Sequence, residues 1–426
     1  MAIAPTLQYT SLLGDRRRFV RLQQLVTAWA QHAQASLAQA LAAPAALKAA
    51  YRFFANRTVT PAAILATARP DCLAQMAAET LVLLIQDTTD LDFTRHRATT
   101  GLGPIGTSKQ QTQGLFVHTC LAASAAGVPL GLAAQRLWHR DPADHGRAAR
   151  RREVPRAAKE SQRWLDLAEA ARAGLPASVQ SVLVADAEAD IFALLAAPRP
   201  PEAALLIRVA HPHRRLEDGQ ALAAVAQQAP ILGRYTVAVH ATPQRQARQA
   251  RCAVRRCAVV VRPPLHQEPG RPYRTPVALT ALWVEEESTP PAGEQPLQWL
   301  LLTTLAATTF LEAATCVGYY SQRWLIEQYH YLLKTGCRAE ALQLRQEARL
   351  ERAVAACCLV AVRLLWLTYL ARQEPEQPCT AAFDTAAWQA LCCACSQQPT
   401  PPPQPPTLRE AVRLVASLGG FLGRTS

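Results

Sequence analysis

Over residues 1–70 the apolar positions recur at a helical spacing, with polar positions between them. The pattern predicts a helix that opens near Gly14 and runs towards Ala40, and a second helix over 47–56. Thr60 and Pro61 predict the start of a third helix, because a capping hydroxyl followed by proline commonly opens a helix. We therefore predict a helical N-terminal domain over 1–70.

Short continuous apolar runs follow, and such runs are typical of strands covered on both faces. They predict strands at 81–85, 114–121, 130–138, 181–185 and 205–209, with a helix at 157–173. Asp87 closely follows the first of these strands, and Asp186 follows the fourth. Acids at the carboxyl ends of buried strands are a favoured place for chemistry in α/β sheets. The order of elements is that of a ribonuclease-H-like core, which predicts an α/β fold.

The pattern changes from about 211 to 296, where strands follow one another without helices between them. These strands are predicted at 235–239, 253–261 and 277–284, and a further strand at 297–303 returns to the core. Between Arg208 and Arg262 the sequence has ten arginines but only two acids, Glu217 and Asp218. We predict a β-rich insertion with a basic surface.

One stretch, 319–334, contains no helix-breaking residue and is predicted to be a single helix. At about 3.6 residues per turn, its polar residues fall on one stripe, opposite the apolar residues that would pack. The stripe consists of Tyr320, Arg323, Glu327 and Lys334. A carboxylate between two cations fits either a solvated salt-bridge stripe or a functional surface.

The remainder of the chain is predicted to be helical. An apolar helix over 348–372 is typical of a core or bundle helix, and an amphipathic helix over 408–418 follows a proline-rich linker. The predicted domains are thus a helical domain (1–70), an α/β domain (71–345) with the insertion at 211–296, and a shortened helical C-terminal region (346–426). The arginine cluster at 16–21 fits either a helical DNA-binding domain or an ordinary solvated face.

Composition narrows the class of protein. Of 426 residues half are hydrophobic, which excludes a disordered chain, and the net charge of +13 favours a polyanionic partner. The sequence has no uncharged apolar run long enough to span a membrane, and its first thirty residues do not resemble a secretory signal. These features predict a cytoplasmic protein. The twelve cysteines show no spacing typical of zinc sites, so we expect reduced, mostly buried thiols.

Three acids are the candidate chemistry: Asp87, Asp186 and Glu327. Two Mg²⁺ ions can activate an attacking oxygen and stabilise a leaving oxygen in phosphodiester chemistry, and carboxylates suffice to hold them. The alternative is that Asp87 and Asp186 merely cap turns. Glu188 and Asp190, which follow Asp186, are interpreted as residues that favour a helix N-terminus.

The ordered motifs resemble those of bacterial cut-and-paste DDE transposases of the insertion-sequence type marked by Tyr-x2-Arg-x3-Glu-x6-Lys. Tyr320, Arg323, Glu327 and Lys334 fit that spacing. The other matching stretches are Gly14–Arg18, Ala50–Phe53, Gln86–Thr89, Asp186–Asp190, Leu297–Thr303 and Lys334–Gly336.

The resemblance implies cleavage of double-stranded DNA at element ends, a hairpin intermediate and transfer of the end into target DNA, with two Mg²⁺ ions or Mn²⁺ in their place. It implies that Trp299 stacks on a flipped base. The alternative is that Trp299 is a strand residue packed in the core. The resemblance also implies that DNA is contacted by Arg17, Arg18, Arg21, Tyr51, Arg52, Arg208, Trp299, Tyr320, Arg323 and Lys334.

This sequence departs from the family pattern in two places. Ala187 stands where the family usually has arginine, and the chain stops soon after Gly419 and Gly420, where the family continues into a segment that pairs two subunits. A homodimer in the DNA complex is therefore expected but left open. The alternatives are a truncated, inactive copy that inhibits transposition by binding DNA, and a plain metal-dependent nuclease of the same fold.

Overall fold

The computed structural model describes residues 5–33, 35–41, 43–106, 112–141, 159–239, 247–264, 273–383 and 385–418. The chain forms two compact units, each assembled from separate segments. The first comprises Met1–Glu79, Thr88–Gly146 and Leu325–Ser426, and the second comprises Thr80–Asp87 and Arg147–Trp324. Strand β1 (Leu81–Asp92) contributes residues to both. The functional domain boundaries expected at 70 and 345 remain predictions.

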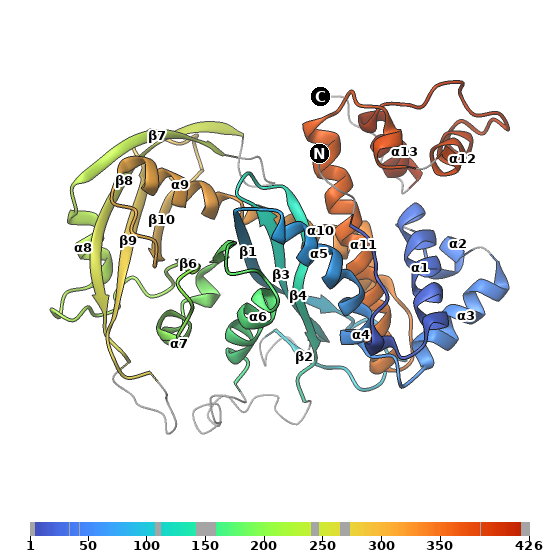
Figure 1. Cartoon of the computed structure of the whole chain (residues 1–426), viewed down its shortest axis with the longest axis horizontal. Helices are drawn as coiled ribbons and strands as arrows, with labels where there is room; N and C mark the ends of the chain where they lie inside the picture. Colours follow the sequence, from blue (N-terminus) through green and yellow to red (C-terminus); the bar gives the residue numbers. More distant parts are fainter. Residues whose placement is uncertain are drawn as a thin grey trace. The chain divides into compact units, whose positions relative to one another are not determined.

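A mixed sheet forms the second unit. The first residues of β1 pair in parallel with β5, and β5 pairs in parallel with β6. Antiparallel strands continue from β6 in the order β10, β9, β8 and β7 (Figure 1). The bounds are β5 (Gln180–Ala185), β6 (Ala203–Arg208), β7 (Ile231–Val239), β8 (Arg248–Val261), β9 (Val277–Glu286) and β10 (Gln298–Thr303). The predicted insertion therefore extends the core sheet through the β9–β10 pairing.

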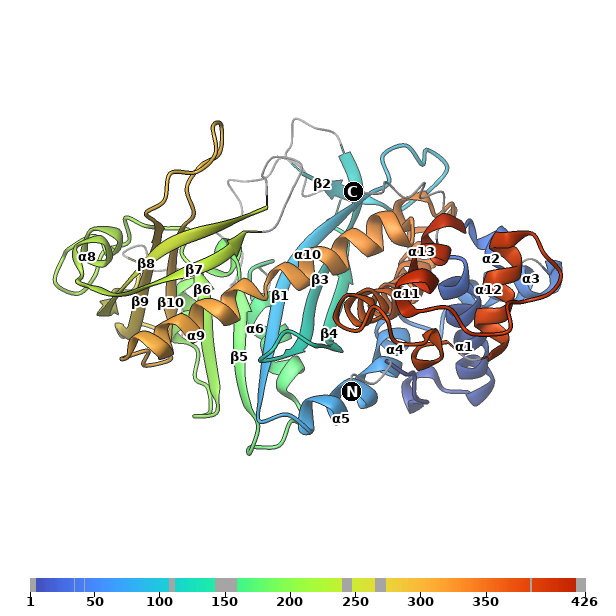
Figure 2. The ribbon, with the colours of Figure 1, turned by 90° about the horizontal axis from the view of Figure 1, so that it is seen from above.

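Four helices accompany this sheet: α6 (Gln162–Arg172), α7 (Phe192–Ala196), α8 (Leu222–Gln228) and α9 (Phe310–Ser321). Helix α9 lies across β6, β7 and β8 (Figure 2). It begins with a capping box, in which the Thr309 hydroxyl accepts the backbone N–H of Glu312 and the Glu312 carboxylate accepts that of Thr309. The start of α9 is thereby fixed by local sequence.

The prediction of one helix over 319–334 is wrong. Helix α9 ends at Ser321, α10 spans Trp324–Tyr331, and a π-helical turn, η7, spans Leu332–Gly336. Between α9 and α10 the N–H groups of Gln322 and Arg323 donate to the carbonyls three residues earlier, those of Tyr319 and Tyr320. The tighter turn departs from ideal α-helical geometry. The expected polar stripe remains a prediction, because its residues belong to both units.

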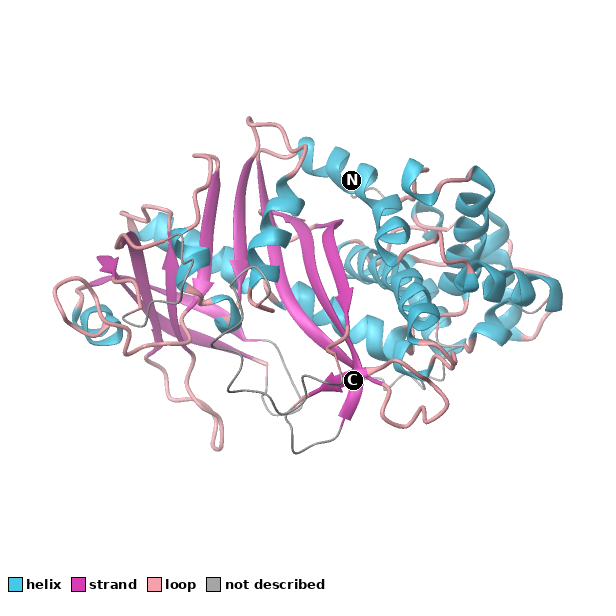
Figure 3. Cartoon of the chain, turned by 90° about the horizontal axis from the view of Figure 1, so that it is seen from below, coloured by secondary structure: helices cyan, strands magenta, loops and turns pink. Residues whose placement is uncertain are grey.

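The first unit is mainly helical and also contains strands, among which β3 (Thr112–Ser124) pairs with β2 (Gly103–Ile105) and β4 (Pro129–Trp138) (Figure 3). Its N-terminal helices are α1 (Arg16–Gln31), α2 (Leu37–Leu41), α3 (Pro44–Ala55), α4 (Pro61–Leu65) and α5 (Arg69–Ala77). The helix expected to run to Ala40 is thus two helices. The start at Thr60 is confirmed, because its hydroxyl accepts the N–H of Ala63.

Helix α11 (Glu347–Gln373) is the central helix of the first unit and contacts α1, α3, α4 and β4. Among the described residues, this helix is long and apolar enough to cross a membrane. However, 72% of its most apolar window is buried inside the protein. This burial fits the predicted core helix.

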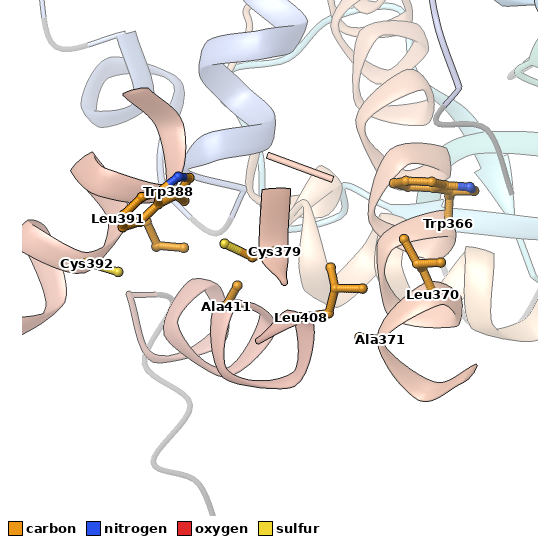
Figure 4. Packing of buried hydrophobic residues seen from close by; sticks show 9 residues of the cluster. All are labelled: Trp366, Leu370, Ala371, Cys379, Trp388, Leu391, Cys392, Leu408 and Ala411. Atoms are coloured by element: carbon orange, nitrogen blue, oxygen red, sulfur yellow. The ribbon is translucent and has the colours of Figure 1, made fainter. Parts of the chain in front are cut away.

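The C-terminal helices α12 (Thr385–Ser396) and α13 (Leu408–Leu418) pack on the end of α11 around a small apolar cluster (Figure 4). The cluster consists of Trp366, Leu370, Ala371, Cys379, Trp388, Leu391, Cys392, Leu408 and Ala411. The predicted amphipathic helix over 408–418 is confirmed. The expectation for the thiols is confirmed as well, since all twelve cysteines are free and nine are buried. The Gly419–Gly420 segment lies outside the described residues.

Arg352 of α11 ties the N-terminal helices to the core of the first unit. Its side chain is 9% exposed, and its guanidinium donates to the carbonyls of Phe54 at 3.1 Å, Ala348 at 2.8 Å and Val59. Phe54 lies in the last turn of α3, where backbone carbonyls lack helical partners. One buried side chain thus supplies donors to the carbonyls of Phe54 and Val59, which lie at and after the end of α3.

We expect Arg352→Met to lower the free energy of unfolding by about 2–4 kcal/mol, because it leaves buried carbonyls without donors. The matched control is Arg349→Met on the same helix, for which we expect a change below about 0.5 kcal/mol. Urea unfolding followed by circular dichroism measures both. Equal losses for the two variants would contradict the anchoring role of Arg352.

Candidate active site

Three polar residues come directly after the last paired positions of the parallel strands of the second unit. In the sheet register Gln86 is opposite Ala185, and Ala185 is opposite Ile207. The next residues are Asp87, Asp186 and Arg208, on strands about 4.8 Å apart. The expectation that Asp87 follows the end of a strand is wrong, because β1 continues to Asp92. It is instead the first residue beyond the parallel pairing with β5.

Asp186 begins the short helix η6 (Ala187–Ala189), and its carboxylate accepts the N–H of Glu188 at 2.9 Å. Glu188 also contacts Arg163, at 3.3 Å. Burial raises the pKa of Glu188, the negative charge of Asp186 raises it further, and Arg163 lowers it. Two carboxylates therefore crowd the loop after β5, an environment that favours a cation.

An aromatic pair lies beside these residues in the second unit. Trp299 of β10 and Tyr320 of α9 meet edge to face, with ring centroids 5.5 Å apart. Tyr320 is only 4% exposed, and burial raises the pKa of its phenol. Arg323 and Arg208 lower that pKa, and the charge of Asp186 raises it, so these groups interact electrostatically. The expectation that Tyr320 lies on an exposed face is wrong.

Arg323 lies close to one of the acids of the sheet, Asp87. Its Nη1 lies 3.7 Å from Oδ2 of Asp87, and both side chains are mostly buried. The guanidinium is positioned by the turn between α9 and α10 described above. A cation is therefore paired with one of the predicted metal ligands.

Glu327 and Lys334 belong to the first unit, so the convergence of Glu327 with Asp87 and Asp186 remains a prediction. Glu327 is exposed on α10. Lys334, in η7, lies 3.1 Å from Asp90 and 3.9 Å from Glu340. Its charge is thus balanced by carboxylates outside the 319–334 stretch. The expected alternative was a stripe of ion pairs within that stretch, and it stays a prediction.

The predicted DNA contacts of the N-terminal helices lie on α1 and α3. Arg17 and Arg52 are exposed, Tyr51 is 42% exposed and Arg21 is half-buried. Arg18 differs, because its guanidinium donates to the carbonyl of Leu13 at 2.9 Å. Arg18 therefore has a structural contact as well as a charge.

The predicted basic surface of the insertion is partly compensated by acids that follow Arg262 in the sequence. Arg234 lies 2.7 Å from Glu287, Arg255 lies 3.3 Å from Glu285, and Arg248 pairs with Glu286. These acids lie on or just after β9, which is adjacent to β8 in the sheet. A count along the sequence misses them because antiparallel pairing brings them in from outside the counted segment.

The first unit contains a further group with metal-ligating side chains. One ligand atom each of His139, Glu347 and Glu351 lies within 4.8 Å of the others, and His139 Nδ1 is 3.2 Å from Glu351 Oε1. Burial raises the pKa of Glu351, whereas His139 lowers it. Sequence reasoning missed this group, although two glutamates four residues apart on one helix face were a visible signal. By donor type it could hold a divalent cation, or form an ion pair alone.

Two family models match the chain. The model described as transposase DNA-binding matches residues 8–59, and the model described as transposase DDE domain matches residues 150–363, half of the chain. The first match contains the five predicted DNA contacts of α1 and α3, and the second contains Asp186, Arg208 and Glu327. Asp87 lies outside both.

The start of α9, the helix that carries Tyr320, packs closely on β7. A Cβ atom at Gly233 of β7 would lie 2.2 Å from the ring of Phe310, the first residue of α9. A Cβ atom at Gly318, which is exposed in the same helix, would meet nothing within 4 Å.

We expect Gly233→Ala to lower the free energy of unfolding by about 1–3 kcal/mol, since the ring of Phe310 must move. Gly318→Ala serves as the matched control and should stabilise the protein by about 0.5–1 kcal/mol, because alanine favours a helix. Thermal unfolding of the two variants decides this, and a tolerated alanine at 233 would show that the start of α9 is not fixed by this contact.

Proposed function

Because this chain belongs to the transposases with a DDE catalytic domain, we propose that it cleaves DNA strands at element ends, forms a hairpin and transfers the end into target DNA. The observation that carries the proposal is the alignment of Asp87 and Asp186 beyond adjacent parallel strands. Members of this class use divalent metal, and DNA is the partner of the matched DNA-binding domain. Two subunits are proposed to act together in the DNA complex.

We propose that Asp87, Asp186 and Glu327 hold two Mg²⁺ ions, or Mn²⁺ in their place. The donors fit this assignment, because they are all carboxylate oxygens and two of them, Asp87 and Asp186, come directly after the last paired residues of neighbouring parallel strands. When bound, such ions supply an activated oxygen nucleophile and stabilise the leaving oxygen. Crowding of Asp186 with Glu188 supports a cation at this edge of the sheet.

The arginines and the aromatic pair are proposed to hold the DNA. Arg208 and Arg323 carry the charge beside Asp186 and Asp87 that can bind phosphates, and Lys334 would do so after leaving Asp90. Trp299 is half-buried at the edge of Tyr320, so its ring can accept a stacked base while Tyr320 stays in place. Burial raises the pKa of the Tyr320 phenol further above neutral pH, so the side chain stays neutral beside the bound DNA.

We expect Asp87→Asn, Asp186→Asn and Glu327→Gln each to lower the rate of strand nicking about a hundredfold or more, equivalent to about 2.7 kcal/mol. DNA binding should persist, because these residues are not phosphate contacts. The assay uses a supercoiled plasmid carrying the DNA that borders the gene, with Mg²⁺ or Mn²⁺, and a gel shift for binding.

Asp218→Asn is the matched control, since this carboxylate only accepts hydrogen bonds from Gln220 in an exposed turn. Nicking that survives in the three variants would refute their assignment. A wild-type protein that binds but does not nick would support an inhibitory copy. Equal nicking of a plasmid without the bordering DNA would support a plain nuclease.

For end recognition, we expect Arg17→Ala and Arg52→Ala each to reduce the slope of log affinity against log salt by about one, without loss of stability. Arg18→Ala should also lower the free energy of unfolding by about 1 kcal/mol, because it loses the hydrogen bond to Leu13. Arg345→Ala, exposed and outside the matched DNA-binding segment, is the control. An unchanged slope for Arg17→Ala and Arg52→Ala would remove them from the interface.

A further inference from the structure

Asp190 is a buried acid that the proposed chemistry does not use. The residue is 5% exposed and its carboxylate 1%. Its Oδ2 accepts the backbone N–H groups of Ala210 at 2.9 Å and His211 at 3.1 Å, and its Oδ1 lies 2.6 Å from Nη1 of Arg214. Arg214 Nη2 also donates to the backbone carbonyl of Asp190 at 3.2 Å.

This arrangement differs from the expectation that Asp190 favours a helix N-terminus. Asp190 instead follows the last residue of η6, and its side chain turns into the protein. Burying a carboxylate is costly unless hydrogen bonds and an opposite charge compensate it. Two N–H groups and one guanidinium provide that compensation, so the contacts of Asp190 define one conformation of the loop.

The contacts join two loops that carry site residues. Asp190 lies four residues after Asp186, in the loop that follows β5. The N–H groups it binds lie two and three residues after Arg208, in the loop that follows β6. Val209 lies between Arg208 and these two residues, and its N–H donates to the carbonyl of Leu300 in β10 at 2.8 Å. The backbone just after Arg208 is therefore held by β10 and by Asp190.

We propose that Asp190, together with Arg214, is a positioning residue that fixes Arg208 relative to Asp186, so that Arg208 meets a DNA phosphate beside the metal-binding acids. The proposal rests on the proposed function of Arg208 as a phosphate contact. Asp190 touches neither DNA nor metal in this role and acts through the main chain. Loss of the Asp190–Arg214 pair should therefore have the same effect on DNA binding as loss of Arg208.

The test is a double-mutant cycle between positions 190 and 208, measured as affinity for a synthetic duplex over a range of salt concentrations. Asp190→Asn keeps an oxygen that can accept the N–H groups but removes the charge that holds Arg214. We expect Arg208→Ala to make the slope of log affinity against log salt about 0.9 less steep. Asp190→Asn should weaken binding in the same direction, although it makes the protein more positive.

In the Arg208→Ala background, Asp190→Asn should have no further effect, because residues that act through one contact are not additive. Full additivity would overturn the proposal, as would an unchanged affinity of Asp190→Asn or of Arg208→Ala. Asp218→Asn, which changes the charge equally in an exposed turn, is the control.

Arg214→Gln breaks the same pair from the other side and replaces Asp190→Asn if that variant does not fold. Its control is Arg215→Gln, an exposed neighbour with the same change of charge. We expect Arg214→Gln, but not Arg215→Gln, to lose its effect in the Arg208→Ala background, and equal behaviour of the two would overturn the proposal. Because the cycle measures binding only, a protein that binds but does not nick refutes the proposed catalysis and leaves the cycle intact.

Discussion

Main-chain hydrogen bonds hold β1, β5 and β6 in parallel, with Gln86, Ala185 and Ile207 at one level. The strands are buried on both faces, so a slip of one residue would move each side chain into a space packed for a different one. The register is therefore strongly specified. Since Asp87, Asp186 and Arg208 are the next residues on these strands, their relative positions follow from the sheet and need no long loop to set them.

Arginine has two uses in this molecule: it pairs with acids in the second unit, and it is exposed on α1 and α3. Within the second unit, guanidinium groups pair with Asp87, Asp190 and Glu286. Arginine suits such pairing because its planar group can satisfy several oxygens at once and stays charged when buried. The net charge of +13 is therefore a poor guide to where a basic surface lies. The exposed arginines of α1 and α3 are better candidates, since they lie within the matched DNA-binding segment.

Much of the fold could be predicted from sequence because apolar runs and capping residues are local signals. Most strands of the core, the start of α4 at Thr60 and the helix at 408–418 were expected within a few residues, although β1 continues to Asp92. The break between α9 and α10 could not be predicted, since no residue there disfavours a helix and only the backbone bonds of Gln322 and Arg323 reveal it.

Site residues could be predicted where a local sequence signal marks them, and could not where only distant partners determine their position. Asp186 directly follows an apolar run, which marks it in the sequence. The burial of Tyr320 and the contacts of Asp190 depend on partners far along the chain, namely Trp299 and Arg214, and no spacing rule reports them. The acids that offset the insertion arginines escaped notice because strand pairing, and not sequence distance, makes them neighbours.

The anchoring of α3 by Arg352 has a consequence for how the protein is made. Arg352 lies 298 residues after Phe54, so α3 leaves the ribosome long before the guanidinium that caps it. The second unit is complete once Trp324 has been synthesised, whereas the first must wait for α11. The N-terminal helices are therefore synthesised first, but they obtain all their contacts only after the second unit has been synthesised.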